Sequence, residues 1–254
     1  MSGVTYLRKV LAHYTLPKAA LLRRAAAFAT VRKTMVKWAG KQLAVVRPSG
    51  SFAKGTAVVG GSDVDMLVLL RRNTEGTLAE LYQSAAQWLR HAGYAAKLQN
   101  VSAQVSVNGF RIDVVPARRQ QAIGFTASLY RRRAQTWTQT NIRKQIDYVK
   151  TSGRRNEIRL LKIWRNLNRL EFTSFALELA VIRSLKGKQR LRLDRNLQQV
   201  LEWIAGNIDS ARLIDPGNSA NDATTDMTSA QLSSIAEAAQ EAADSTSWGD
   251  FVWT

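Results

Sequence analysis

Two aspartates one residue apart, Asp63 and Asp65, stand at the start of the apolar run Met66–Leu70. Such a run predicts a β-strand, and residues i and i+2 of a strand project from the same face. Two carboxylates side by side repel each other strongly unless a divalent cation lies between them. The chain is therefore expected to fold around a sheet that presents an acid pair at the beginning of one strand.

A glycine–serine turn and a third aspartate extend this pattern. Gly50 and Ser51 precede the acid pair, and residues 1–62 hold no Asp or Glu at all. Asp113 lies between apolar residues on a second predicted strand, where an uncompensated buried carboxylate would be costly. A cation shared with Asp63 and Asp65 would remove that cost. The three acids therefore predict a two-cation site acting on a nucleoside triphosphate, in which one cation activates a hydroxyl and the other neutralises the leaving pyrophosphate.

Composition limits the other classes of function. The 254 residues are 45% hydrophobic, enough for an extensive core, and they include no cysteine and only two histidines. A disulfide framework or a thiolate zinc site is thereby excluded, and a histidine-based metal site is not expected. Without a secretory signal or a membrane-spanning run, the protein is expected in the cytoplasm. The formal net charge of +18, together with the run Arg131–Arg133, favours polyanionic partners: triphosphates, RNA or tRNA, or both.

Hydrophobic periodicity and turn residues predict most of the secondary structure. Asn108-Gly109 between two alternating runs is a hairpin signal and predicts a βαββ core over residues 43–116. After Pro116 the pattern is interpreted as helical. The predicted strands are 43–46, 63–70, 95–107 and 110–115; the predicted helices are 17–40, 77–92, 140–150, 155–169, 173–185, 194–207 and 229–243; a polar turn is predicted at 215–222.

The expected fold class is α+β with two lobes. Residues 1–116 would form a small mixed-sheet lobe with an N-terminal helix, packed against a helical lobe of residues 117–254, with the active site in the cleft. Trp137 and Trp164 are interpreted either as core residues or as platforms on which a base could stack.

The motif order resembles the polymerase-β-like nucleotidyltransferase superfamily. Gly50-Ser51, the Asp63-x-Asp65 pair and the later strand residue Asp113 carry this resemblance. The segments Arg159–Trp164, Ser174–Leu179 and Ile214–Asn218 look like the helical half of oligoadenylate synthases and bacterial cyclic-oligonucleotide synthases (CD-NTases), over about residues 43–225.

The resemblance implies roles for individual residues. Gly50 and Ser51 would hold the β- and γ-phosphates, and Lys54, Lys162 and Ser174 would also contact the nucleotide. Asp63 and Asp65 would ligate both of two Mg²⁺ ions, for which Mn²⁺ could substitute, and Asp113 would ligate one ion and help to deprotonate the nucleophile. For Lys162, a solvated basic helix face shared with Arg159, Arg165 and Arg169 is the alternative explanation.

Three functions are weighed. The leading one is template-independent transfer of a nucleoside monophosphate, with ATP the expected donor, to a ribose hydroxyl, making a short linear or cyclic oligonucleotide. The second is an RNA 3′-end transferase similar to the CCA-adding enzymes of tRNA, although the chain lacks the additional RNA-binding domains of the archaeal enzymes. The third is a catalytically silent RNA-binding module, against which the clustered carboxylates argue.

Overall fold

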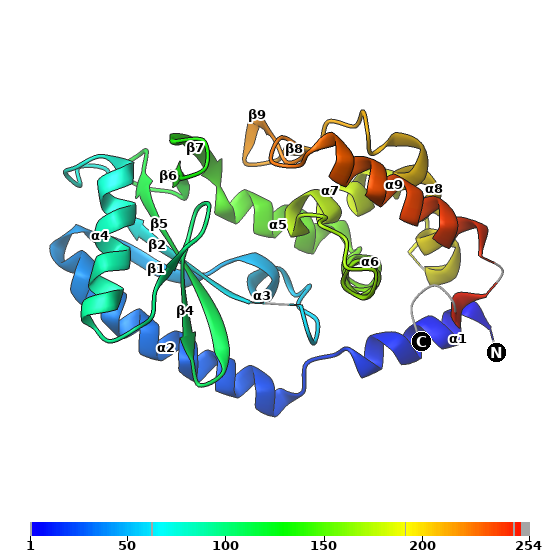
Figure 1. The fold of residues 1–254 in the computed structure, drawn as a ribbon, viewed down its shortest axis with the longest axis horizontal. Coiled ribbons are helices and arrows are strands. Elements are labelled where there is room, and N and C mark those ends of the chain that lie inside the picture. Colours follow the sequence, from blue (N-terminus) through cyan, green and yellow to red (C-terminus); the bar gives the residue numbers. More distant parts are fainter. Residues whose placement is uncertain (1, 62, 191, 246, 250–254) are drawn as a thin grey trace. The chain divides into compact units, whose positions relative to one another are not determined.

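The computed structural model describes residues 2–61, 63–190, 192–245 and 247–249. These residues form two compact units. The sheet unit comprises residues 17–54 and 62–146, and the helical unit comprises residues 1–16, 55–61 and 147–254. The predicted α+β class with a mixed sheet is confirmed (Figure 1). The division differs from the predicted boundary between residues 116 and 117, because the sheet continues beyond Pro116 and because residues 1–16 are grouped with the helical unit.

The sheet unit is built on a long helix and a mixed sheet. Its helices are α2 (Lys18–Ala39), the 3₁₀ turn η1 (Gly40–Gln42), α3 (Gly50–Lys54) and α4 (Leu78–His91). Its strands are β1 (Leu43–Pro48), β2 (Val64–Leu70), β3 (Lys97–Leu98), β4 (Ala103–Val107), β5 (Phe110–Arg119), β6 (Thr126–Arg131) and β7 (Thr136–Asn141). The predicted helix from Pro17 is confirmed, with Pro17 as its N-cap.

Strands β2 and β5 are parallel neighbours in the centre of the sheet, and β1 and β4 flank them antiparallel in the order β1-β2-β5-β4-β3. One face, which carries Met66 and Val114, packs against apolar residues of α2 and α4. The opposite face carries Leu67, Leu69 and Ala117, packed with residues of β6. Because side chains alternate along a strand, the odd-numbered residues of β2 and β5 all point to this second face.

Two strands lie where a helical pattern was expected. β6 and β7 extend the sheet from the end of β5, and β6 pairs with residues 117–119. The polar, threonine-rich sequence of β7 shows little apolar alternation, because this strand pairs with a single strand in the described structure and has only one buried residue. Threonine is β-branched and favours strands, which fits the observed structure.

The helical unit contains α1 (Gly3–His13), α6 (Arg155–Leu167), α7 (Ser174–Ser184), α8 (Leu193–Asn207) and α9 (Ser229–Asp244), with a small hairpin of β8 (Ile214–Asp215) and β9 (Asn218–Asp222). Helix α5 (Ile142–Ser152) begins in the sheet unit and continues in this one. The core includes Leu161, Trp164, Leu177 and Val58, which comes from the segment 55–61. The predicted helices from residue 140 onward are confirmed to within a few residues.

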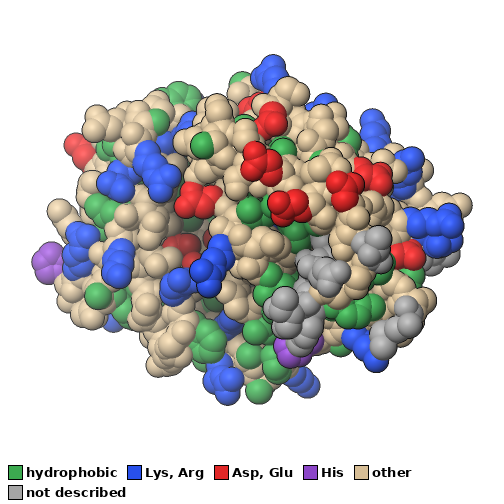
Figure 2. All heavy atoms as spheres, turned by 45° about the vertical axis from the view of Figure 1, so that its right-hand side comes forward, with side chains coloured by type: hydrophobic (Ala, Val, Ile, Leu, Met, Phe, Trp, Pro, Cys, Tyr) green, Lys and Arg blue, Asp and Glu red, His purple; other side chains and the backbone are tan. Residues whose placement is uncertain are grey.

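The face drawn in Figure 2 carries both acidic and basic side chains. Among the described residues, no helix is both long and apolar enough to span a membrane.

Candidate active site

The three predicted acids meet at one edge of the sheet unit. Asp65 and Asp113 are register partners on the parallel strands β2 and β5, and Asp63 directly precedes β2. All three occupy odd-numbered positions, so they belong to the face opposite α2 and α4. The structure therefore brings the predicted carboxylates together, as the spacing and the strand context required.

Two neighbouring side chains bond to these acids. The side-chain amide of Gln104, on β4, donates to Asp113 Oδ1 at 3.1 Å and to Asp63 Oδ2 at 3.4 Å. Arg111 forms an ion pair with Asp63, with 2.7 Å between Nε and Oδ1. One amide thus reaches two carboxylates, which shows how closely they lie. Gln104 was not predicted, although the two-residue Asn108-Gly109 turn fixes the register that places it opposite Asp113.

Burial makes one of these acids a stronger proton acceptor than an ordinary aspartate. The pKa of Asp113 is raised above its usual value, mainly because burial penalises the charged carboxylate and further because the charge of Asp63 lies nearby. The hydrogen bond from Gln104 opposes this shift of the pKa but does not cancel it. We call the part of the sheet that carries Asp63, Asp65 and Asp113 the acid edge. A positive charge at the acid edge would therefore be favourable.

The predicted glycine–serine turn lies directly against Asp65. Gly50 has a φ of 56°, and a Cβ atom on it would lie 1.8 Å from Asp65 Oδ2. The Ser49 amide donates to the Asp65 carbonyl at 2.9 Å, so the start of α3 is tied to β2. Glycine is required here because any side chain would collide with the carboxylate. Ser51 follows on the half-buried first turn of α3, and Lys54 ends that helix with 6% of its surface exposed.

The acid edge has the donor chemistry of a divalent-cation site. Carboxylate oxygens are the ligands that Mg²⁺ prefers in proteins, and three aspartates lie here at adjacent positions on one face of two neighbouring strands. However, no group of three or more His, Cys, Asp or Glu side chains within the described residues is gathered in the geometry of a metal site. Asp63 bonds instead to Arg111, and Asp113 to Gln104. The ligand types therefore fit a cation, which would share the Asp63 carboxylate with Arg111 or replace this contact.

The other two predicted nucleotide contacts belong to the helical unit. Lys162 on α6 is only 1% exposed, and its Nζ donates to Glu178 Oε1 at 2.7 Å and to Thr56 Oγ1 at 3.0 Å. The Thr56 hydroxyl donates to Glu178 Oε1 at 2.9 Å and completes the network. A solvated position for Lys162 is thus wrong, because this ammonium belongs to a buried ion pair.

Ser174 begins α7 and is exposed, and its hydroxyl accepts a hydrogen bond of 2.9 Å from Arg165 Nη1. Arg165 also donates to the Phe172 carbonyl at 3.0 Å and is itself 8% exposed. Burial lowers the pKa of Arg165, and the charge of Glu178 partly offsets this effect. The sequence contained one signal for Glu178 and Arg165, namely charged residues set within apolar helix faces. Contact of Lys162 or Ser174 with a triphosphate stays a prediction.

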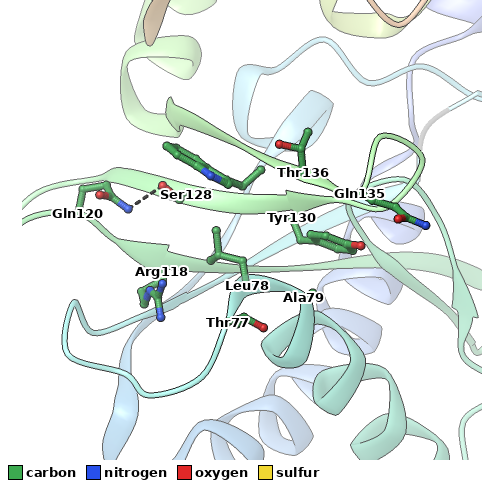
Figure 3. A pocket seen from close by; sticks show the side chains of 10 residues that line it. Thr77, Leu78, Ala79, Arg118, Gln120, Ser128, Tyr130, Gln135 and Thr136 are labelled. Carbon is green, nitrogen blue, oxygen red and sulfur yellow. Dashed lines mark hydrogen bonds between the residues drawn. The ribbon is translucent and has the colours of Figure 1, made fainter.

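The two tryptophans differ in their surroundings. Trp164 is buried in the core of the helical unit, whereas Trp137 on β7 is 58% exposed. Trp137 helps to line a cavity of about 460 Å³ in the sheet unit, between the start of α4 and strands β5 to β7. Figure 3 shows its wall, including the hydrogen bond of 2.6 Å that Gln120 donates to Ser128.

Comparison with known proteins gives the class of this chain. Residues 31–156 match the family model of the nucleotidyltransferase domain, a range that holds the glycine–serine turn and all three acids. The chain therefore carries a nucleotidyltransferase domain and is a nucleotidyltransferase. The resemblance to the polymerase-β-like superfamily and its CD-NTase branch is confirmed.

Particular relatives lie among the bacterial synthases. The cyclic AMP-AMP-AMP synthase of Escherichia coli (strain MS 115-1) is 25% identical over 237 residues, 78% of this chain and 74% of that protein. The structure of E. coli MS115-1 CdnC with ATP has a TM-score of 0.75 at 22% identity, covering 94% of this chain and 89% of CdnC. The CD-NTase CdnG of Bradyrhizobium diazoefficiens, solved with GTP, has a TM-score of 0.77 at 14% identity, covering 97% of this chain and 94% of CdnG. These two structural likenesses concern the fold.

Proposed function

We propose that this enzyme transfers a nucleoside monophosphate from a nucleoside triphosphate, ATP being the expected donor, to a ribose hydroxyl without a template. The proposed product is a short linear or cyclic oligonucleotide. The approach of the Gly50 backbone to the Asp65 carboxylate carries this proposal, because it puts the glycine–serine turn against the acid edge. The E. coli relative is named for a cyclic AMP-AMP-AMP product, which supports the same class of reaction.

The reaction is a substitution at the α-phosphorus. The acceptor hydroxyl oxygen forms a bond to this phosphorus, the bond to the bridging oxygen breaks, and pyrophosphate leaves with the electron pair. The hydroxyl proton moves to the Asp113 carboxylate, which accepts a proton more readily than an ordinary aspartate because burial raises its pKa. The backbone amides and the hydroxyl at Gly50 and Ser51 would hold the β- and γ-phosphates during the transfer.

Asp63, Asp65 and Asp113 would hold the divalent cations, Mg²⁺ or Mn²⁺. Cations bound there would supply positive charge to the triphosphate and the departing pyrophosphate. A cation bound there would compete with Arg111 for the Asp63 carboxylate. An ion pair whose arginine is 59% exposed is weak, and its exchange for a cation costs little.

The test is pyrophosphate release from ATP by purified protein with Mg²⁺ or Mn²⁺. Asp65→Asn should reduce the rate by on the order of 10²-fold or more, because it weakens the negative charge that would hold the divalent cations. Asp209→Asn, at an exposed aspartate of the helical unit, is the matched control and should leave the rate unchanged. Near wild-type turnover by folded Asp65→Asn protein would contradict the proposal. Absence of pyrophosphate release by the wild-type protein, with and without RNA, would favour a silent RNA-binding module.

A further inference from the structure

A second cluster of charge lies at the other end of the same strands. Arg71 directly follows β2 and Arg119 ends β5, and the parallel register that pairs Leu70 with Arg118 brings these two arginines next to each other. Asp65 on β2 and Asp113 on β5 each lie six residues earlier than these arginines. A strand rises about 3.3 Å per residue, so the two clusters are separated by roughly 20 Å. The arginine cluster is therefore distinct from the acid edge.

A cavity of about 520 Å³ is lined by Arg71, Arg72, Asn73 and Arg119, all within the sheet unit. None of its lining residues is acidic or aromatic. Arg71 Nε donates to the Leu43 carbonyl at 3.4 Å, and Arg119 Nη1 to the Ala122 carbonyl at 2.9 Å. Within the described structure no carboxylate pairs with these guanidinium groups. Three like charges around one cavity repel each other, so an anion bound there would be favourable.

One buried donor strengthens this conclusion. Arg119 Nε is buried and has no hydrogen-bond partner among the described residues. Buried donors in folded proteins are seldom left without a partner, and a shift of the Arg119 side chain towards an anion in the cavity would provide one. The cavity in Figure 3 differs in this respect, because Arg118 there donates to the Thr74 and Gly76 carbonyls at 3.1 and 2.6 Å.

We propose that Arg71, Arg72 and Arg119 form a second anion site that binds a small molecule with linked phosphate groups, such as pyrophosphate or the triphosphate chain of a nucleotide. Guanidinium groups bind phosphate oxygens through paired hydrogen bonds, and the Asn73 amide adds further donors. The volume exceeds that of one phosphate and suits a short oligophosphate. Because no aromatic residue lines the cavity, recognition rests on the phosphates and not on a base.

The inference is tested by calorimetry on the full chain in EDTA at low salt, titrated separately with inorganic tripolyphosphate, pyrophosphate and ATP. Arg71→Gln and Arg72→Gln should each weaken tripolyphosphate binding at least about fivefold. Arg133→Gln removes the same charge from an exposed arginine outside the cavity and should change the affinity less than twofold. Equal losses in Arg72→Gln and Arg133→Gln would show general charge attraction and overturn the proposal, and so would absence of binding.

One further variant separates this site from the proposed active site. Asp65→Asn should lose transfer and keep tripolyphosphate binding in EDTA, so the two proposals fail independently. ATP binding no tighter than tripolyphosphate binding supports recognition of phosphates alone. Much tighter binding of single-stranded RNA that depends equally on these arginines would identify a strand as the ligand and contradict the small-molecule site.

Discussion

At the scale of single residues, Gly50 is the position where the smallest change should have the largest effect. Gly50→Ala would place a methyl group against the Asp65 carboxylate and would strain a backbone with a φ of 56°. We expect a strong loss of pyrophosphate release, with a stability cost of about 1–2 kcal/mol for the left-handed backbone. Gly40→Ala is the control, because Gly40 has a φ of 48° with nothing within 4 Å of its added Cβ. Equal activity of the two variants would show that the close approach of Gly50 to Asp65 does not affect activity.

The raised pKa of Asp113 predicts how the stability of the protein depends on pH. Its pKa is raised in the folded state, so the folded protein holds this proton more tightly than the unfolded chain. The stabilisation is present in acid and is lost as pH rises through the folded pKa. In EDTA, Asp113→Asn should therefore gain stability relative to wild type as pH rises from about 4 to 7. Urea denaturation at several pH values measures this difference; a difference that is constant with pH would contradict the shift.

The residues of the acid edge could be predicted because strand alternation and hairpin pairing are short-range rules that can be applied to the sequence. Alternation along strands gives the common face of Asp63, Asp65 and Asp113, and the Asn-Gly hairpin also fixes Gln104 opposite Asp113. The pairing of Thr56 with Glu178 is a different case, since 122 residues of chain separate them. Short-range sequence patterns do not predict a contact between residues so far apart in the chain.

At the scale of elements, helices α6 and α7 are joined by the buried ion pair of Lys162 and Glu178. Lys162→Ala should destabilise the protein by roughly 3–5 kcal/mol, because it leaves the Glu178 carboxylate charged in the core without the Lys162 ammonium. The double variant Lys162→Met with Glu178→Gln should recover much of this loss. Lys186→Ala, at an exposed lysine, should change the free energy of unfolding by less than about 0.5 kcal/mol. Chemical denaturation measures all three; a small effect of Lys162→Ala would contradict the ion-pair role.

The same double variant tests the predicted phosphate contact of Lys162. If this lysine also contacts the triphosphate, folded double variant should bind ATP more weakly by about 1.5–3 kcal/mol, the value of a charge-assisted contact. Calorimetry in the presence of Mg²⁺ measures the affinity. Unchanged ATP affinity would assign Lys162 to the core alone.

Elements with strong periodicity were predictable, and those with weak patterns were not. Helix α8 buries a clear apolar face, and α6 and α7 are buried over most of their length, so their bounds were predicted closely. Strand β7 is polar and has a single buried residue. Helix α1 is an exception, because it was not predicted although Leu7, Val10 and Leu11 recur at helical spacing. The grouping of residues 55–61 with the helical unit depends on long-range packing of Val58 and on the bond from the Val59 amide to the Tyr14 carbonyl.

At the scale of the whole molecule, the open question is the acceptor of the nucleotide. With 37 Lys and Arg against 19 Asp and Glu, the protein should bind RNA non-specifically at low salt whatever its function, so RNA binding alone decides nothing. An oligonucleotide synthase takes its hydroxyl from a second mononucleotide, whereas an RNA-end transferase takes it from a 3′ terminus. The two functions therefore differ in what the enzyme does without RNA.

We expect nuclease-treated enzyme, given nucleoside triphosphates and Mg²⁺ alone, to make oligonucleotides. The reason is that the proposed transfer requires only a triphosphate and a ribose hydroxyl, and a second triphosphate supplies that hydroxyl. Chromatography of labelled products, with and without phosphatase, distinguishes linear from cyclic species because a cyclic product has no terminal phosphate to remove. Asp65→Asn protein carried through the same preparation controls for a contaminating polymerase. An enzyme that is inert under these conditions, yet extends tRNA 3′ ends at physiological salt, would instead be an RNA-end transferase.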